Sequence, residues 1–98
     1  MYKRQLAIVK FKSGEGKFEK FMGWMQSDEG MAERKKIADV TKTVPGVKPD
    51  KSGVLFKISV HNEEGMKKFV TSQNSAIKPI YDECVESFQA WELSPVKL

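Results

Sequence analysis

The sequence of 98 residues contains a single cysteine, Cys84, and a single histidine, His61. One cysteine cannot form a disulfide within the chain, and this usage is typical of proteins from a reducing compartment. A zinc site needs several Cys or His ligands at short spacing, which these two distant residues do not provide. We therefore expect no metal and no cofactor, and no motif around Cys84 supports a nucleophilic role.

Long apolar runs are also missing. The apolar run near the N-terminus, from Leu6 to Val9, has four residues. A secretory signal needs about seven or more, and a membrane-spanning helix needs about 20. We therefore expect a soluble, cytoplasmic protein with no membrane partner.

Charge of one sign is not concentrated in any region. The 17 basic and 13 acidic side chains give a net charge of +4, and the densest basic run, "ERKK" at 33–36, contains Glu33 itself. Nucleic-acid-binding proteins usually carry a concentrated basic stripe. We interpret the run as a solvated helix face rather than a site for an anionic partner, and we expect no nucleic-acid partner.

The hydrophobic periodicity predicts alternating strands and helices. Gly23, inside the first helix, would suit a place where another backbone comes close. Pro45-Gly46 suits a type II turn, and one more helical turn is expected after Pro79. The β-α-β-β-α-β order indicates a ferredoxin-like α+β fold with a four-stranded antiparallel sheet, as a single domain over residues 1–98. The expected strands are 5–12, 37–44, 54–61 and 84–93, and the expected helices are 17–27, 27–36 and 62–70.

Alternation divides each expected strand into two sets of side chains. One set is almost wholly apolar and should face the helices, with Lys42 as an exception between Val40 and Val44. The other set should be mostly polar if it faces solvent. An apolar patch there would exceed what monomers usually expose, so we predict a homodimer that packs sheet against sheet. The apolar residues of this second set are Leu6, Ile8, Leu55, Val85, Trp91 and Leu93.

Two segments, "SDEGMAERKKIADVTKTVPGV" and "VLFKISVHNEEGMKKFV", resemble a small family of uncharacterised bacterial proteins of about this length. The element order, the broken first helix and the half-apolar second face also resemble the dimeric α/β-barrel superfamily, which includes the antibiotic-biosynthesis monooxygenases. The resemblance covers roughly residues 5–93. It implies a dimeric α/β barrel, but it contains no catalytic signature, and a shared fold does not imply a shared function.

Two other binding functions receive little support from the sequence. "GEGKFE" at 14–19 follows a strand and opens a helix, as phosphate-binding loops do, but Glu19 stands where the dinucleotide motif needs glycine and Glu15 would repel phosphate. RNA-recognition domains share the strand order and stack bases on aromatic side chains of the central strands. The corresponding face of this chain has Leu6, Ile8, Leu55 and Lys57 and no aromatic side chain, which argues against an RNA-recognition domain.

His61 lies where a strand pattern gives way to a helix pattern. A catalytic histidine needs an orienting partner. The neighbouring Asn62, Glu63 and Glu64 are better explained by helix capping and the helix dipole. We favour a structural or surface histidine, with a place in a pocket as the alternative, and the catalytic residues stay unassigned.

Aromatic and thioether side chains gather on the two main predicted helices. Most should belong to the core, but methionine and aromatic residues also suit a cleft that admits a small apolar or aromatic ligand between helices and sheet. The residues predicted to line this cleft are Trp24, Met25, Lys42, His61 and Tyr81.

Three functions stay open, and the sequence favours the first. It is a homodimeric protein that binds a small apolar or aromatic molecule. The second rests on the resemblance alone and is a cofactor-independent monooxygenase, in which His61, Trp24 and Tyr81 would be the residues to test. The third is a protein-interaction module that uses the sheet face or the basic helix.

Overall fold

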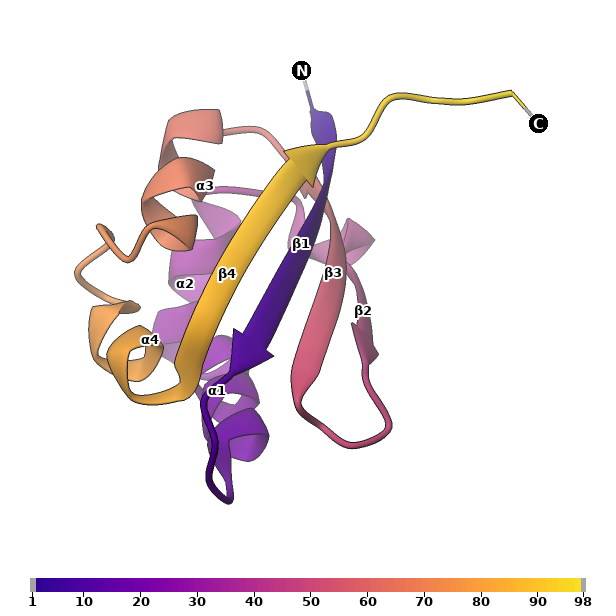
Figure 1. Cartoon of the computed structure of the whole chain (residues 1–98). Helices are drawn as coiled ribbons and strands as arrows, with labels where there is room; N and C mark the ends of the chain where they lie inside the picture. The colour runs from indigo at the N-terminus through magenta and orange to yellow at the C-terminus, as the bar shows by residue number, and fades with distance from the viewer. Residues whose placement is uncertain (1, 98) are drawn as a thin grey trace.

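Residues 2–97, which the computed structural model describes, form one antiparallel sheet with four α-helices (Figure 1). The strands lie in the order β2-β3-β1-β4, and every neighbouring pair is antiparallel. This arrangement confirms the predicted ferredoxin-like α+β fold. The elements are β1 (Lys3–Phe11), α1 (Lys17–Gln26), α2 (Asp28–Lys35), the 3-10 helix η1 (Val40–Lys42), β2 (Val44–Val47), β3 (Gly53–Val60), α3 (Glu63–Val70), α4 (Lys78–Cys84) and β4 (Val85–Glu92).

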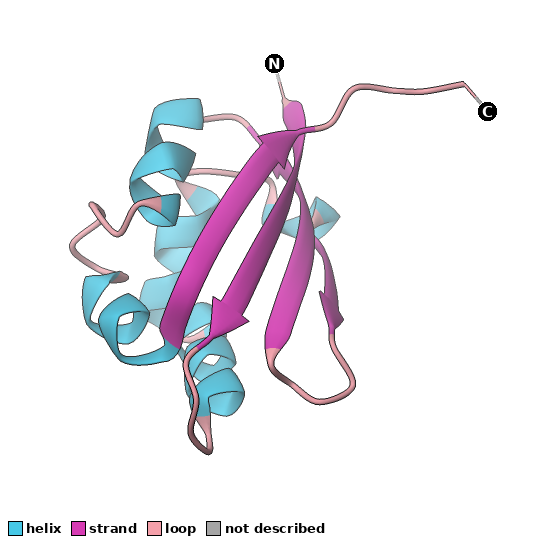
Figure 2. Cartoon of the chain, viewed as in Figure 1, coloured by secondary structure: helices cyan, strands magenta, loops and turns pink. Residues whose placement is uncertain are grey.

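The helices α1 to α4 all lie on the same side of the sheet, and none of them crosses the opposite face (Figure 2). The space between the two layers is filled by apolar side chains, as the alternation in β1 and β3 predicts. Phe21 of α1 and Ile77, which precedes α4, are fully buried there. The strand residues in this core are Ala7, Val9, Phe11, Val54, Phe56, Val60, Val85 and Phe88.

The second strand begins later in the chain than the sequence predicts. The expected strand at 37–44 is wrong, because only Ala38 makes an isolated bridge, to Val60, before the chain turns into η1. The Asp39 carboxylate accepts hydrogen bonds from the Thr41 amide at 3.0 Å and from the Thr41 hydroxyl at 2.6 Å. Such a local side-chain interaction gives the backbone an alternative to a sheet ladder.

Pro45 and Gly46 lie inside β2 and do not form the predicted type II turn. β2 is an edge strand, where a proline is tolerated because a missing N–H need not break the ladder. The turn comes later, at residues 48–52. Asp50 accepts hydrogen bonds there from the amide and hydroxyl of Ser52, and Lys51 has a left-handed φ of 60°.

Val85 lies on the helix side of the sheet, which corrects its predicted place on the second face. Lys10 pairs with Ser87, whereas the next residue, Phe11, pairs with Val85. Glu86 is therefore an extra residue in β4 and forms a β-bulge, which reverses the alternation of side chains. As a result Val85 is only 3% exposed and belongs to the core.

Helices α1 and α2 meet at Ser27 and approach each other closely at Gly30. The Ser27 hydroxyl oxygen accepts a hydrogen bond from the Gly30 amide at 3.1 Å and so caps α2. A Cβ atom on Gly30 would collide with the Trp24 carbonyl oxygen and would lie 3.0 Å from the Met25 Cα. Gly23, where the sequence suggested such a contact, has no atom within 4 Å of the same position.

We predict opposite effects for alanine at these two glycines. Gly30→Ala should lower the free energy of unfolding by about 3 kcal/mol, because the helices must move apart to admit the methyl group. Gly23→Ala, the matched control in α1, should raise it by about 0.5–1 kcal/mol, because alanine has the higher helix propensity. Urea unfolding of both variants measures the difference. Equal stabilities would contradict the close approach at Gly30.

Candidate functional site

A small apolar cavity, here called the β2 hollow, lies between the helices and the sheet beside edge strand β2. Its outer part has a volume of about 120 Å³ and its inner part about 30 Å³. Gln26 and Pro45 are exposed and line the outer part, so the β2 hollow reaches the surface. The two parts share the lining residues Met25, Arg34, Val40, Thr43 and Phe56.

The β2 hollow follows from the way the chain enters β2. Because η1 replaces much of the expected strand, Val40 and Thr43 line the hollow instead of pairing with β3. The inner part is completed by Ile37, Ala38, Ile58, Met66, Phe69 and Phe88.

Arg34 provides the charge at the β2 hollow. Its Nη1 donates hydrogen bonds to the Met25 carbonyl oxygen at 3.1 Å and to the Met31 sulfur at 3.0 Å, both of which are neutral acceptors. Within residues 2–97 every ion pair is made by a lysine, so Arg34 has no carboxylate partner there. Burial lowers the pKa of the Arg34 guanidinium from its usual value.

Of the residues predicted to line a ligand cleft, Met25 lines the β2 hollow. Its neighbour in the sequence, Trp24, directs its side chain toward Phe69 and Glu29 instead. Met25 is 6% exposed. The centroids of the Trp24 and Phe69 rings lie 6.1 Å apart, and the Trp24 Nε1 donates a hydrogen bond to Glu29 at 2.8 Å. Trp24 therefore helps to join α1, α2 and α3.

Tyr81 holds α4 against the end of α3. Its hydroxyl donates a hydrogen bond to the Val70 carbonyl oxygen at 2.9 Å, and its ring stacks on Phe88 with 6.2 Å between centroids. Burial, with a smaller contribution from Asp82, raises the pKa of the Tyr81 phenol. The phenol thus stays protonated and is a poor base.

Lys42 and His61 lie together near the start of β1, and neither lines the β2 hollow. The Lys42 ammonium is 5.6 Å from the centroid of the Tyr2 ring, and the same ring meets His61 edge-on at 5.7 Å. His61 Nε2 lies 3.0 Å from the Lys35 carbonyl oxygen. Lys42 is exposed on η1, so its predicted place on the covered face of the sheet is wrong.

Cys84 ends α4 with its side chain fully buried. Burial, followed by the nearby Glu83 carboxylate, raises the pKa of the Cys84 thiol. A thiol in this setting is a poor nucleophile.

Another cavity, with a volume of about 660 Å³, borders the glycine-containing loop between β1 and α1. The charged residues around it are four lysines and four carboxylates, so the loop lacks the positive field that a phosphate site needs. These residues are Lys10, Lys12, Lys17 and Lys51, and Glu15, Glu19, Asp50 and Glu86.

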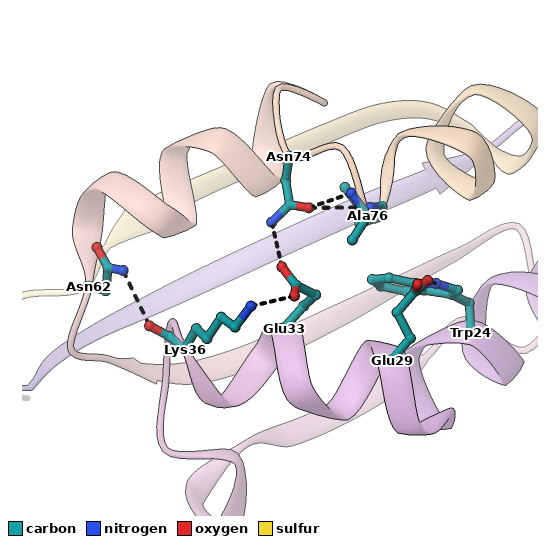
Figure 3. A network of polar contacts seen from close by, with 8 residues as sticks. Trp24, Glu29, Glu33, Lys36, Asn62, Asn74 and Ala76 are labelled. Atoms are coloured by element: carbon teal, nitrogen blue, oxygen red, sulfur yellow. Dashed lines mark hydrogen bonds and ion pairs between the residues drawn. The ribbon is translucent and has the colours of Figure 1, made fainter.

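A polar network ties α2 to the segments around α3 (Figure 3). The Asn74 side-chain oxygen accepts a hydrogen bond from the Ala76 amide at 2.8 Å, and its Nδ2 donates to Glu33 at 3.2 Å. Lys36 donates to the other Glu33 oxygen at 2.8 Å, and the Lys36 carbonyl oxygen accepts a bond from Asn62 at 3.2 Å. The network fixes α2, and with it the position of Arg34.

The uncovered face of the sheet is organised in rows of directly paired residues. One row runs Val44, Lys57, Leu6 and Trp91, and the next runs Gly46, Leu55, Ile8 and Gln89. Leu93 extends the face, since its amide donates to the Arg4 carbonyl oxygen. Val44, Leu55 and Trp91 are 61%, 37% and 47% exposed. This set, called the open face below, contains the five residues predicted for a dimer contact, and Val44 as well.

The sequence pattern does not identify the positions of Arg34 and Val44. Arg34 belongs to the basic run interpreted as a solvated face, but it follows Gly30 by four residues and so shares the face of α2 that meets α1. This spacing distinguishes it from Lys35 and Lys36. The alternation predicts Val44 on the covered side, which is wrong, because Asp39 and η1 change the register in which the chain enters β2.

No protein-family model and no curated protein matches this sequence. Two solved structures share the fold. One is a dimeric ferredoxin-like protein from an uncultured marine organism, with a TM-score of 0.58 and 10% identity over 99% of this chain and 91% of that one. The other is a protein from Shewanella oneidensis, with a TM-score of 0.51 and 20% identity over 93% of this chain and 89% of that one.

These similarities show the ferredoxin-like fold. They do not extend to the antibiotic-biosynthesis monooxygenases or to the small bacterial family, so both resemblances stay predictions. No helix within residues 2–97 is both long enough and apolar enough to cross a membrane. The cytoplasmic location also stays a prediction.

The Glu33 network predicts a loss of stability in acid. Hydrogen bonds, first from Lys36 and then from Asn74, lower the pKa of the Glu33 carboxyl below its ordinary value of 4.5. The ionised form is therefore favoured in the folded state, and its contribution of less than about 1 kcal/mol is complete above pH 4.5 and lost as the pH falls through the lowered pKa. Glu33→Gln should reduce stability at neutral pH but not at a pH below the lowered pKa, where the carboxyl is protonated in both states.

Urea unfolding across this pH range measures the effect. Glu15→Gln is the control, because the exposed Glu15 lies outside the helices and makes no ion pair within residues 2–97. Its stability should run parallel to that of the unaltered protein. A constant difference between Glu33→Gln and the unaltered protein at all pH values would contradict the predicted role of the carboxylate.

Proposed function

We propose that the protein is a homodimer that binds a small, largely apolar or aromatic molecule in the β2 hollow. The observation that carries the binding proposal is an apolar cavity that reaches the surface and is bordered by Met25, Phe56 and Arg34. Ligand sites are concave and mostly apolar, with a few polar groups that orient the ligand. Methionine side chains at the opening, from Met22 and Met25, can adapt to different shapes.

Binding is favoured over the monooxygenase alternative by the positions of the three residues that would carry it. His61, Trp24 and Tyr81 do not meet in one cavity, and each directs a polar atom to a partner within the fold. A general base must reach the substrate atom that loses a proton. Exposed His61 lies beside Tyr2 and Lys35 and lines neither part of the β2 hollow.

The dimer proposal rests on the open face. Two adjacent rows carry Leu6, Trp91, Leu55 and Ile8 toward solvent, while the helices cover only the other side of the sheet. A closed two-fold contact would bury the same apolar patch on both copies. The similar protein from the marine organism is described as dimeric, which supports this assembly. The β2 hollow lies on the helix side and stays accessible in such a dimer.

The positive charge of Lys57 opposes self-association, so the strength of the dimer should depend on charge and on salt. It lies between Val44 and Leu6, in the row that ends at Trp91, and makes no ion pair within residues 2–97. In the dimer its apolar stem covers the neighbouring side chains while the ammonium reaches the rim. Arg4 adds a second positive charge to the same face, so salt should strengthen self-association by screening the repulsion between copies.

We predict that benzene, used as a probe, binds in the β2 hollow. Saturating benzene should shift the amide resonances of Met25, Val40 and Phe56 in heteronuclear NMR spectra. Val40→Phe should abolish these shifts because the new ring fills the cavity, whereas Val47→Phe, on the same edge but outside the hollow, should leave them unchanged. Unperturbed spectra of the unaltered protein at saturation would contradict a ligand site.

We also predict that charge on the open face controls the dimer. Leu6→Lys should raise the dimer dissociation constant by tenfold or more, about 1.4 kcal/mol, because it buries unpaired charges next to their copies. Lys57→Met should lower that constant. Gln73→Lys adds the same charge in the exposed loop after α3 and should leave it unchanged. Sedimentation velocity distinguishes these outcomes, and a Leu6→Lys dimer as tight as the original would exclude this face.

A further inference from the structure

Arg34 has donors that its own fold does not use. Nη1 is engaged by the Met25 carbonyl oxygen and the Met31 sulfur, whereas Nε and Nη2 make no hydrogen bond within residues 2–97. None of its side-chain nitrogens is buried without a partner, so these donors are reached from the hollow or from solvent. The guanidinium thus presents unused N–H groups at a cavity whose other walls are mainly apolar.

A structural role for Arg34 explains only part of this arrangement. The bond to Met25 satisfies a carbonyl group near the end of α1, where four carbonyls lack helical partners. One nitrogen is enough for that purpose, and a neutral side chain could supply it. A partly buried cation without a counter-ion is unfavourable, because attraction to a carboxylate does not offset the hydration that the cation loses. An anion in the hollow would supply the missing charge.

We propose that the β2 hollow selects a small monocarboxylate, whose apolar body packs on Met25, Phe56 and Phe69 while its carboxylate pairs with Arg34. This inference rests on the proposed binding function and names its ligand class. A guanidinium suits a carboxylate because two parallel N–H donors match its two oxygens. Thr43, whose hydroxyl makes no hydrogen bond within residues 2–97, can contribute a further donor.

The size of the cavity restricts the apolar body to about one ring or a short branched chain. The outer part measures about 120 Å³, and a cavity of about 150 Å³ holds one benzene ring. Nucleotides and long-chain lipids are therefore too large for the hollow as it stands. Benzoate and its neutral isostere benzamide are suitable probes, because they differ mainly in charge.

The test is a calorimetric titration of both probes into the unaltered protein and three variants. The unaltered protein should bind benzoate about tenfold or more tightly than benzamide, as expected for a hydrogen-bonded charge pair. Arg34→Met should remove this preference and leave benzamide affinity within about twofold, and Arg34→Lys should restore part of it. Lys35→Met removes a positive charge from the same helix outside the hollow and should change neither affinity.

The outcomes separate this inference from the proposed function. Equal affinity of the unaltered protein for benzoate and benzamide would overturn the carboxylate inference but leave a ligand-binding hollow. Absence of binding by benzene, benzoate and benzamide would overturn both. The comparison of probes in the unaltered protein needs no variant, so a misfolded Arg34→Met would not prevent a decision. A preference for benzoate that Arg34→Met retains and Lys35→Met abolishes would also overturn the role of Arg34.

Discussion

The sheet carries apolar side chains on both faces, and the helices of this chain cover one of them. The covered face supplies the core through Ala7, Val9, Val54 and Val60, whose removal from water is the main favourable contribution to folding. The same alternation in β1 and β3 directs Leu6, Ile8 and Leu55 the other way. The strands that supply the core therefore also carry an uncovered apolar surface on the opposite face of the sheet. A second copy of the chain is the simplest cover for this surface.

The short edge strand β2 links the fold to the candidate ligand site. Asp39 diverts the chain into η1, and β2 forms for only four residues. Beside this short strand, next to the end of α1, the β2 hollow opens to the surface. Gly30 allows α1 and α2 to approach, and the Asn74–Glu33 bond fixes α2 against the loop before α4. Through these contacts Arg34 is held at the hollow, so the position of its charge depends on tertiary contacts as well as on its spacing from Gly30.

Periodicity was sufficient to predict the fold class, the long strands and the helices that begin after Ser27 and Asn62, because each of these depends on local pattern and capping. It failed where one side chain or one extra residue changes the register. Asp39 displaced β2, and the bulge at Glu86 turned Val85 into the core. The candidate site was harder to predict. Arg34 and Lys35 are neighbouring basic residues, and they differ in which of them lies on the face of α2 that meets α1. Of the predicted cleft residues, Met25 lines the β2 hollow, while Lys42 and His61 lie together beside Tyr2.

We infer that a second copy of the chain covers the open face. The most direct test is the molar mass of the unaltered protein in solution, measured by light scattering at micromolar concentration. We predict twice the 11.1 kDa of one chain, with a greater dimer fraction at higher salt. A mass of one chain at every concentration and salt level, with Leu55 and Trp91 left in water, would contradict it and would leave this face for a different protein partner.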